Sequence, residues 1–423
     1  MPLKRRIGLL EATIYGVGLI LGAGIYALIG KAAGEAGNAL WLSFVLAAVI
    51  SSLTGLSYAE LSSRFPRAAA EFVFASRAFS SRFVSFMVGY LTVATGIVSA
   101  ATVALGFGEY LYAASGFPIL LGAGLLILAL SFLNFYGIKE SSYMNIVFTA
   151  VEFFGLVFII AVSSSFLGSV DYFEVPSLEG IFSAAVLIFF AYLGFEEIAN
   201  IAEETKRPRR VIPLAILGSI AVTTVLYVLV AVSAVSVVPW QELGRVEAPL
   251  AEVSERALPG SSGIFSVIAL FATANTVLIL LIVTSRMLYG MSRGGSLPRV
   301  FSKVHGSRGT PHIAVWTVGL LSALFLSVGD IKTVAEVTNF GVFLIFLAVN
   351  LSLISVRLRS GFHRGFTVPL NAGRIPVPAV VGAAFCVYML AFFSSQAMVL
   401  NIGLLIFGVL LYAALRGLSG RKA

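Results

Sequence analysis

The most constraining feature of the sequence is a succession of long apolar runs separated by short polar breaks. About 20 apolar residues in a helix are enough to cross a bilayer, and runs of that length recur along all 423 residues. Hydrophobic residues make up 59% of the chain and charged residues only 11%, whereas soluble proteins carry about 25% charged residues. This composition excludes an ordinary soluble enzyme, a disordered chain and a coiled coil, and it indicates a polytopic membrane protein.

The apolar runs predict an all-α fold with twelve transmembrane helices. Backbone amides in hydrocarbon must be paired internally, and barrel strands would be shorter and would alternate in polarity. The first run follows the basic segment Met1–Arg6 and is too long for the core of a cleaved signal, so we expect it to be retained. The predicted helices are Ile7–Gly30, Ala39–Leu61, Phe83–Ala113, Ile119–Tyr136, Asn145–Leu167, Ile181–Ala202, Ile212–Val238, Ile264–Tyr289, Ile313–Ser327, Thr333–Val356, Val377–Phe393 and Val399–Leu415.

The distribution of lysine and arginine predicts the orientation, because cytoplasmic loops are enriched in these residues. If the N-terminus is cytoplasmic, the basic residues that face outside are Lys31, Arg245, Arg256 and Lys332, and all the others lie inside or at inner helix ends. We therefore expect a multi-pass protein of the plasma membrane with cytoplasmic tails at 1–6 and 416–423. The same asymmetry explains the net charge of +8 without a nucleic-acid partner.

Residues for covalent or metal chemistry are scarce. Cys386 is the single cysteine, and the three histidines lie in polar connecting segments, so we expect no disulfide, metal site or cofactor. The chain has no phosphate-binding or zinc-protease motif, and its two aspartates, Asp171 and Asp330, fall in predicted loops. We therefore do not expect an enzyme.

Two predicted helices contain glycine-rich interruptions, Gly22-Ala23-Gly24 in the first and Leu193-Gly194-Phe195-Glu196 in the sixth. Glycine destabilises a helix interior. A break would expose amides with partial positive charge, suited to a carboxylate, and carbonyls suited to an ammonium group. For the first triplet alone, close helix packing is an equally good interpretation. Interruptions at matching positions in two halves are typical of transporter binding sites. They predict two inverted repeats, 7–167 and 181–356, followed by 377–415.

Four stretches resemble motifs of the amino acid–polyamine–organocation superfamily, especially its cationic-amino-acid-transporter-like branch. They are Gly16–Ala27 (GVGLILGAGIYA), Tyr58–Phe74 (YAELSSRFPRAAAEFVF), Phe190–Ile216 (FAYLGFEEIANIAEETKRPRRVIPLAI) and Ser285–Phe301 (SRMLYGMSRGGSLPRVF). The motifs occur in the family order, and the resemblance extends to about Leu415. In one departure, Ala68-Ala69-Ala70 stands where the family often has two glycines or serine and glycine.

The resemblance implies the five-plus-five inverted-repeat fold of sodium-coupled leucine transporters and alternating access for amino acids. It also implies the substrate contacts. The amides of Ala23 and Gly24, beside Gly22, would bind the substrate carboxylate. Phe190 would be an aromatic gate, and Glu196, beside Gly194, an acidic gate. The carbonyls that would receive the amino group are those of Ile20, Phe190, Ala191 and Leu193.

Glu152 is the most informative departure from the family pattern. It lies in the first half of the fifth predicted helix. The position resembles one at which some proton-coupled relatives have a lysine. In sodium-driven relatives a sodium ion occupies the place of that lysine. Burial favours the neutral form of a carboxyl group, so Glu152 can carry a coupling proton. Two alternatives are a sodium ligand and a purely structural group hydrogen-bonded to the broken first helix. Asn275 and Thr276 are further candidates for the ion or substrate site, or for interhelical hydrogen bonds.

The sequence therefore predicts a secondary transporter that imports amino acids, with a proton as the expected co-substrate. No acidic residue lies in the middle of the third, eighth or tenth predicted helix, which favours a neutral substrate, although Glu196 leaves a cationic one open. The alternatives are an uncoupled amino acid or polyamine exchanger, a sodium symporter and, less favoured, a channel or receptor. The pattern carries no signal for an oligomeric state.

Overall fold

The computed structural model describes residues 7–65, 70–136, 138–201, 205–306, 308–327, 331–361 and 365–420. For 138–147, 200–201 and 417–420, it describes the backbone alone. Several positions named above lie outside the described residues: Ala68, Ala69, Asp330 and the two ends of the chain at 1–6 and 421–423.

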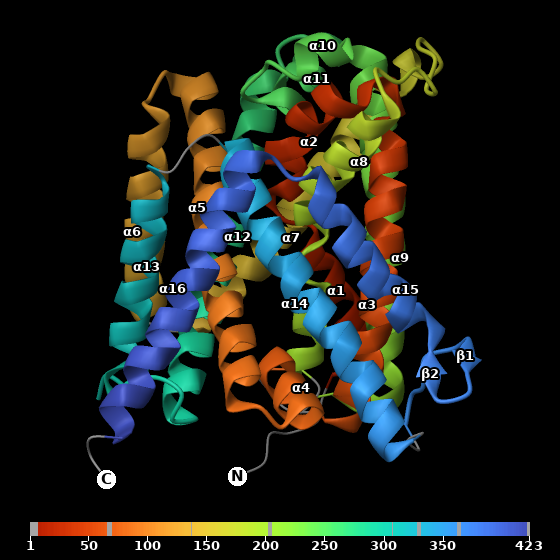
Figure 1. Cartoon of the computed structure of the whole chain (residues 1–423). Coiled ribbons are helices and arrows are strands. Elements are labelled where there is room, and N and C mark those ends of the chain that lie inside the picture. Colours follow the sequence, from red (N-terminus) through yellow and green to blue (C-terminus); the bar gives the residue numbers. More distant parts are fainter. Residues whose placement is uncertain are drawn as a thin grey trace.

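Long helices pack side by side in a bundle, and α1 begins and α16 ends at the same end of it (Figure 1). A short antiparallel pair, β1 (Asn371–Ala372) and β2 (Ile375–Pro376), lies between α14 and α15. The helices are α1 Leu9–Ile20, α2 Ala23–Ala36, α3 Leu40–Arg64, α4 Ala70–Phe79, α5 Arg82–Ser115, α6 Ile119–Tyr136, α7 Ile138–Val162, α8 Leu178–Ile188, α9 Pro208–Val237, α10 Trp240–Leu243, α11 Pro249–Ala257, α12 Ser262–Arg293, α13 His312–Phe325, α14 Ile331–Ser360, α15 Val377–Met389 and α16 Ser395–Gly420. The 3-10 turns that matter below are η3 Phe189–Tyr192 and η4 Phe195–Ile201.

The outer faces of the bundle are strongly apolar. In the described part of the chain, eight helical segments are long and apolar enough to cross a membrane, and four shorter helices are also apolar. On α6 and α16, large side chains such as Leu125 and Leu410 are exposed. Contiguous exposed apolar surface is rare on soluble proteins. The chain is therefore an all-α polytopic membrane protein, while the number of twelve spans and the inverted repeat stay predictions.

Some helices end before the predicted apolar runs do, such as α7 at Val162 and α15 at Met389, whereas several others extend beyond the runs. For example, α5 begins at Arg82, where the Ser81 hydroxyl accepts a hydrogen bond from the Val84 amide. Polar first and last turns continue a helix because caps and water satisfy their free backbone groups. The seventh helix begins earlier than the predicted Ile212: α9 begins at Pro208, and Pro213 lies inside it. A proline this near the start removes one hydrogen bond of the second turn.

Three short helices at the two ends of the bundle were not predicted. Helix α4 lies near the end that carries the start of α1, and α10 and α11 lie at the opposite end (Figure 1). These helices are too short to give an apolar run of spanning length, which is the pattern on which the prediction relied. The ends marked by them are called the α4 end and the α10–α11 end below.

Both predicted interruptions are present. Helix α1 ends at Ile20 and α2 begins at Ala23, so the break falls at Leu21–Gly22 and overlaps the first residue of the predicted triplet. Helix α8 ends at Ile188 and continues as η3, and the chain is then non-helical at Leu193–Gly194 before η4. Gly194 has a φ of +118°, a conformation that residues other than glycine rarely adopt.

Candidate functional site

The two interruptions pack directly against each other. A Cβ atom on Gly24 would lie 2.5 Å from the Ala191 Cα atom, and one on Gly194 would lie 2.6 Å from the Leu19 carbonyl oxygen. Both distances are shorter than any ordinary carbon contact, and both involve backbone atoms that cannot rotate away. Glycine is therefore required at both positions because the two broken segments approach so closely.

A cavity of about 120 Å³ lies beside the two breaks, which is room for several water molecules. Its walls come from the α1–α2 break, the η3–η4 segment, α5, α12 and Val342 of α14. Because its α5 and α12 residues belong to the halves of those helices nearer the α4 end, the cavity extends from the breaks toward that end. The predicted site residues that line it are Ile20, Gly22, Gly24, Phe190, Ala191, Leu193, Gly194, Glu196 and Thr276.

Several backbone groups at the breaks already have partners. The Ala23 amide donates to the Thr276 hydroxyl at 3.0 Å, and the Gly22 amide donates to the Ile20 carbonyl at 2.6 Å. The Phe190 carbonyl accepts from the Leu193 amide at 3.3 Å. The Ala23 amide, expected from the sequence to bind the substrate carboxylate, is therefore not free at the first break. The following amides of the first turn of α2 have no partner within that helix.

Tyr227 of α9 joins the two breaks and was not predicted. Its buried hydroxyl lies 2.7 Å from the Ile20 carbonyl oxygen and 3.1 Å from the Ala191 carbonyl oxygen. One hydroxyl group thus contacts an acceptor in each interrupted segment. The signal was available in part, because a tyrosine inside an apolar helix must find a hydrogen-bond partner, but the sequence does not say which one.

We expect Tyr227→Phe to lower the free energy of unfolding by about 1–3 kcal/mol, because it leaves buried carbonyls short of a donor. Ligand affinity should fall as well, since the relative position of the two breaks loses a fixed point. Thermal unfolding and ligand binding in detergent measure the two effects. Tyr110→Phe is the matched control: it also removes a buried hydroxyl from a carbonyl, that of Tyr26 at 2.9 Å, but leaves both breaks untouched. Equal affinity losses in the two variants would contradict this role of Tyr227.

Glu152 of α7 lies beside the first turn of α2 and does not line the cavity. Its backbone carbonyl accepts from the Tyr26 hydroxyl of α2 at 2.7 Å, and its Oε1 atom accepts from the Asn275 side chain at 3.2 Å. Its side chain is fully buried, and among the described residues its Oε2 atom and the Asn275 Oδ1 atom have no hydrogen-bond partner. Asn275 thus contacts Glu152 on α7, and the neighbouring Thr276 contacts the Ala23 amide at the break.

Three carboxyl groups gather on the α4 side of the cavity. Glu196 and Glu197 line it, and Glu71 of α4 lies near Glu196. The Tyr58 hydroxyl donates to Glu71 at 3.1 Å, and burial raises the pKa of the Glu71 carboxyl. The Glu196 carboxylate turns back to accept from the Gly194 amide at 2.9 Å. Among the described residues, no three His, Cys, Asp or Glu side chains gather in a way that could hold a metal ion.

Comparison with known families gives the geometry its context. A family model described as amino acid permease matches residues 7–415, which is nearly the whole chain. The chain belongs to the amino acid permease family. This permease is therefore a membrane transporter and not an enzyme, and the superfamily resemblance drawn from its four motifs is confirmed.

Relatives of the permease cover most of its length. It is 30% identical to the branched-chain amino acid permease BcaP of Bacillus subtilis, over 97% of this chain and 92% of that protein. It is 28% identical to the methylthioribose transporter of Bacillus subtilis, over 92% of this chain and 88% of that protein. It is 32% identical to cationic amino acid transporter 9 of Arabidopsis thaliana, over 72% of this chain and 58% of that protein.

Proposed function

We propose that this permease is a secondary transporter that imports amino acids across the plasma membrane by alternating access. In this proposal its twelve spans comprise two inverted repeats, 7–167 and 181–356, with 377–415 appended and both termini cytoplasmic. The observation that carries the proposal is the cavity beside two broken helices that pack against each other. Broken helices supply backbone donors and acceptors together, and a zwitterion needs both.

The substrate backbone would bind at the breaks. Its carboxylate would approach Gly22 and Gly24 at the positive end of α2, with Thr276 and Ala23 already fixed beside them by their hydrogen bond. Its ammonium group would approach the carbonyls of Ile20, Phe190, Ala191 and Leu193. The Tyr227 hydroxyl contacts two of these four acceptors, and the Leu193 amide donates to a third, the Phe190 carbonyl. A carbonyl oxygen can accept two hydrogen bonds, so the substrate would share these acceptors with their present donors. This binding mode would recognise the carboxylate and ammonium groups that all α-amino acids have in common.

The remaining walls favour a neutral aliphatic side chain. On α12 they are formed by apolar residues such as Ile279, Val283 and Met287, and burial of a methylene group contributes about 0.8 kcal/mol. A cationic side chain is the second candidate, because Glu196 and Glu197 line the α4 side of the same cavity. A branched-chain amino acid permease and a cationic amino acid transporter both stand among the relatives.

Uptake into proteoliposomes tests the proposal. The panel includes leucine, valine, arginine, lysine and methylthioribose, each supplied under an imposed proton gradient, an imposed sodium gradient or neither. Saturable uptake of a neutral amino acid is expected. Uptake of methylthioribose with no amino acid transported would overturn the proposal. Uptake confined to vesicles preloaded with amino acid would indicate an exchanger, and conductance without saturation would indicate a channel.

We further propose that Glu152 carries the coupling proton. Its buried carboxyl group has an oxygen without a partner, and protonation would turn that oxygen into a donor for a neighbouring acceptor such as the Asn275 Oδ1 atom. A sodium ion held by the same two oxygens is the alternative. A purely structural carboxyl group would be expected to have both of its oxygens satisfied.

Glu152→Gln should therefore abolish accumulation driven by a proton gradient while leaving uptake down a substrate gradient. One charge moved across 100 mV is worth about 2.3 kcal/mol, or roughly 40-fold accumulation, and the variant should reach only equal concentrations on both sides. Glu179→Gln, at an exposed carboxyl group of α8, is the control and should accumulate normally. Full proton-driven accumulation by Glu152→Gln would contradict the assignment, and accumulation by the wild type under sodium alone would favour the alternative.

A further inference from the structure

A second pocket, unrelated to the breaks, opens at the α4 end of the bundle. It has a volume of about 700 Å³ and lies between the α4–α5 turn, the end of α12 and the end of α16. Its described lining contains two arginines, Arg82 and Arg416, and five serines, Ser76, Ser80, Ser81, Ser85 and Ser296. None of its described lining residues is acidic, so the pocket carries a net positive charge.

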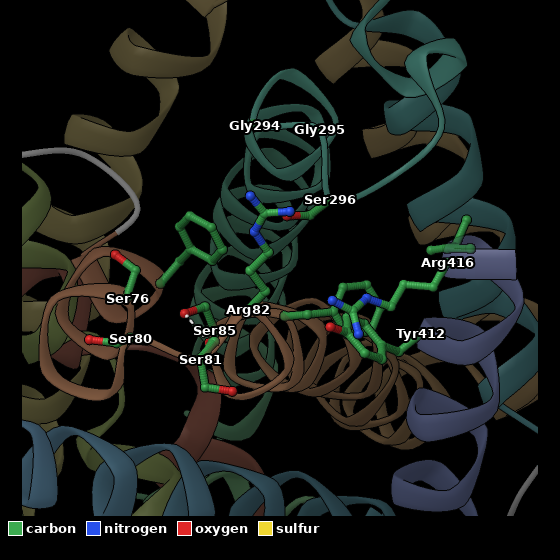
Figure 2. A pocket seen from close by; sticks show the side chains of 13 residues that line it. Ser76, Ser80, Ser81, Arg82, Ser85, Gly294, Gly295, Ser296, Tyr412 and Arg416 are labelled. Atoms are coloured by element: carbon green, nitrogen blue, oxygen red, sulfur yellow. Dashed lines mark hydrogen bonds between the residues drawn. The ribbon is translucent and has the colours of Figure 1, made fainter. Parts of the chain in front are cut away.

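The two arginines are directed into this pocket from different helices. Figure 2 shows the Arg82 side chain extending from the start of α5 and the Arg416 side chain extending from α16. Both residues are exposed, and Arg416 lies over the Tyr412 ring at 5.4 Å from its centroid. Neither arginine takes part in an ion pair within the part of the chain that the structure describes. Their charges are therefore available to an anion from outside the protein.

An apolar groove continues from the same pocket into the depth of the bundle. It has a volume of about 470 Å³, and it shares Phe86 and Leu415 with the basic pocket. Its walls come from α5, α12, α13 and α16, and the one tyrosine hydroxyl among them, that of Tyr90, donates to the Leu404 carbonyl at 2.9 Å. Along α5 the groove runs from Phe86 to Ile97, about 16 Å at 1.5 Å per residue. That length is about half of the roughly 30 Å of hydrocarbon in a bilayer, which is the depth of one leaflet.

We propose that the basic pocket and the apolar groove together bind one anionic glycerophospholipid. Its phosphate would lie between Arg82 and Arg416, where guanidinium groups suit phosphate geometry, and one acyl chain would fill the groove. The basic residues of the chain indicate that the α4 end faces the cytoplasm, and the cytoplasmic leaflet carries the anionic lipids. A soluble phosphate would leave the groove unused, and a zwitterionic lipid would bring a cation close to two arginines.

Lipid titration of the detergent-purified full chain, followed by native mass spectrometry, tests this site. The probes are phosphatidylglycerol, phosphatidylcholine with the same acyl chains, and inorganic phosphate. The variants are Arg82→Gln/Arg416→Gln and, as the control, Arg359→Gln, which removes an exposed arginine of α14 at the same end of the bundle. The wild type should bind phosphatidylglycerol in preference to phosphatidylcholine.

The double variant should lose about 30-fold in affinity for phosphatidylglycerol, equivalent to roughly 2 kcal/mol at 1.4 kcal/mol per tenfold change. The Arg359 control should keep the affinity of the wild type. Equal affinity of the wild type for the two lipids would overturn the proposal, and so would an unchanged affinity in the double variant. Inorganic phosphate that competes with the lipid at equal concentration would indicate an anion site without a lipid and would also refute it. The comparison of the two lipids on the wild type holds whether or not the variants fold.

Discussion

Replacing Gly24 with alanine should abolish amino acid uptake. The added Cβ atom would lie 2.5 Å from the Ala191 Cα atom, so η3 would have to move away from α2 and the cavity beside the breaks would change shape. A displacement of about 1 Å in a preorganised site is enough for losses on the order of a hundredfold. Uptake and equilibrium binding of the transported amino acid in proteoliposomes measure the effect.

Gly403→Ala is the matched control, because a Cβ atom on Gly403 of α16 would meet nothing within 4 Å. Both variants should elute as single species in detergent gel filtration, so that a loss of binding in Gly24→Ala is not confused with unfolding. If folded Gly24→Ala bound its substrate with the affinity of the wild type, the breaks would not be the substrate site.

Breaking the buried ion pair between Glu60 and Arg357 should give the largest loss of stability. Arg357 of α14 donates from its Nε atom to Glu60 of α3 at 2.7 Å, with a second contact through Nη2, and both side chains are fully buried. The Val368 amide also donates to Glu60, at 2.8 Å. Arg64 of α3 also pairs with Glu60, at 2.9 Å. Removing Arg357 leaves the buried Glu60 carboxylate with Arg64 as its cation, so we expect Arg357→Met to lower the free energy of unfolding by about 3 kcal/mol, the lower end of the range for breaking a buried pair.

The double variant Glu60→Gln/Arg357→Met should recover part of that loss, because it removes both charges of the pair, while Arg64 keeps its hydrogen bond to the Gly361 carbonyl at 2.7 Å. Arg256→Met provides the comparison. Arg256 pairs with Glu242 at 2.7 Å and Glu252 at 2.6 Å, but its side chain is 39% exposed, and exposed pairs contribute about 0–1 kcal/mol. Thermal and denaturant unfolding in detergent measure all three variants. A loss in Arg357→Met no larger than that in Arg256→Met would show that the buried pair is not a stabilising element.

The two helix interruptions could be predicted because their cause is local. Glycines beside Ala23 and Leu193 weaken a helix whatever surrounds it, and the structure breaks both helices at those places. The long apolar runs were equally informative, since a helix that crosses hydrocarbon must be apolar along its length. Helix ends were less predictable, because the polar turns of α5 and α12 continue past the apolar runs.

The contacts around the site could not be predicted, because they join residues far apart in the sequence. The hydroxyl of Tyr227 meets carbonyls at Ile20 and Ala191, and the hydroxyl of Thr276 takes up the Ala23 amide. Nothing in the composition of any one helix identifies such partners. The same holds for Glu60 and Arg357, which lie on different helices 297 residues apart in the sequence.

The position of Tyr227 constrains how this protein can change shape. Because the Tyr227 side chain on α9 contacts both α1 and η3, neither interrupted segment can move alone without losing one of these buried hydrogen bonds. The rearrangement that keeps both hydrogen bonds is therefore one in which α1 and η3 move together as a rigid body, with α9 either moving with them or providing the axis of rotation.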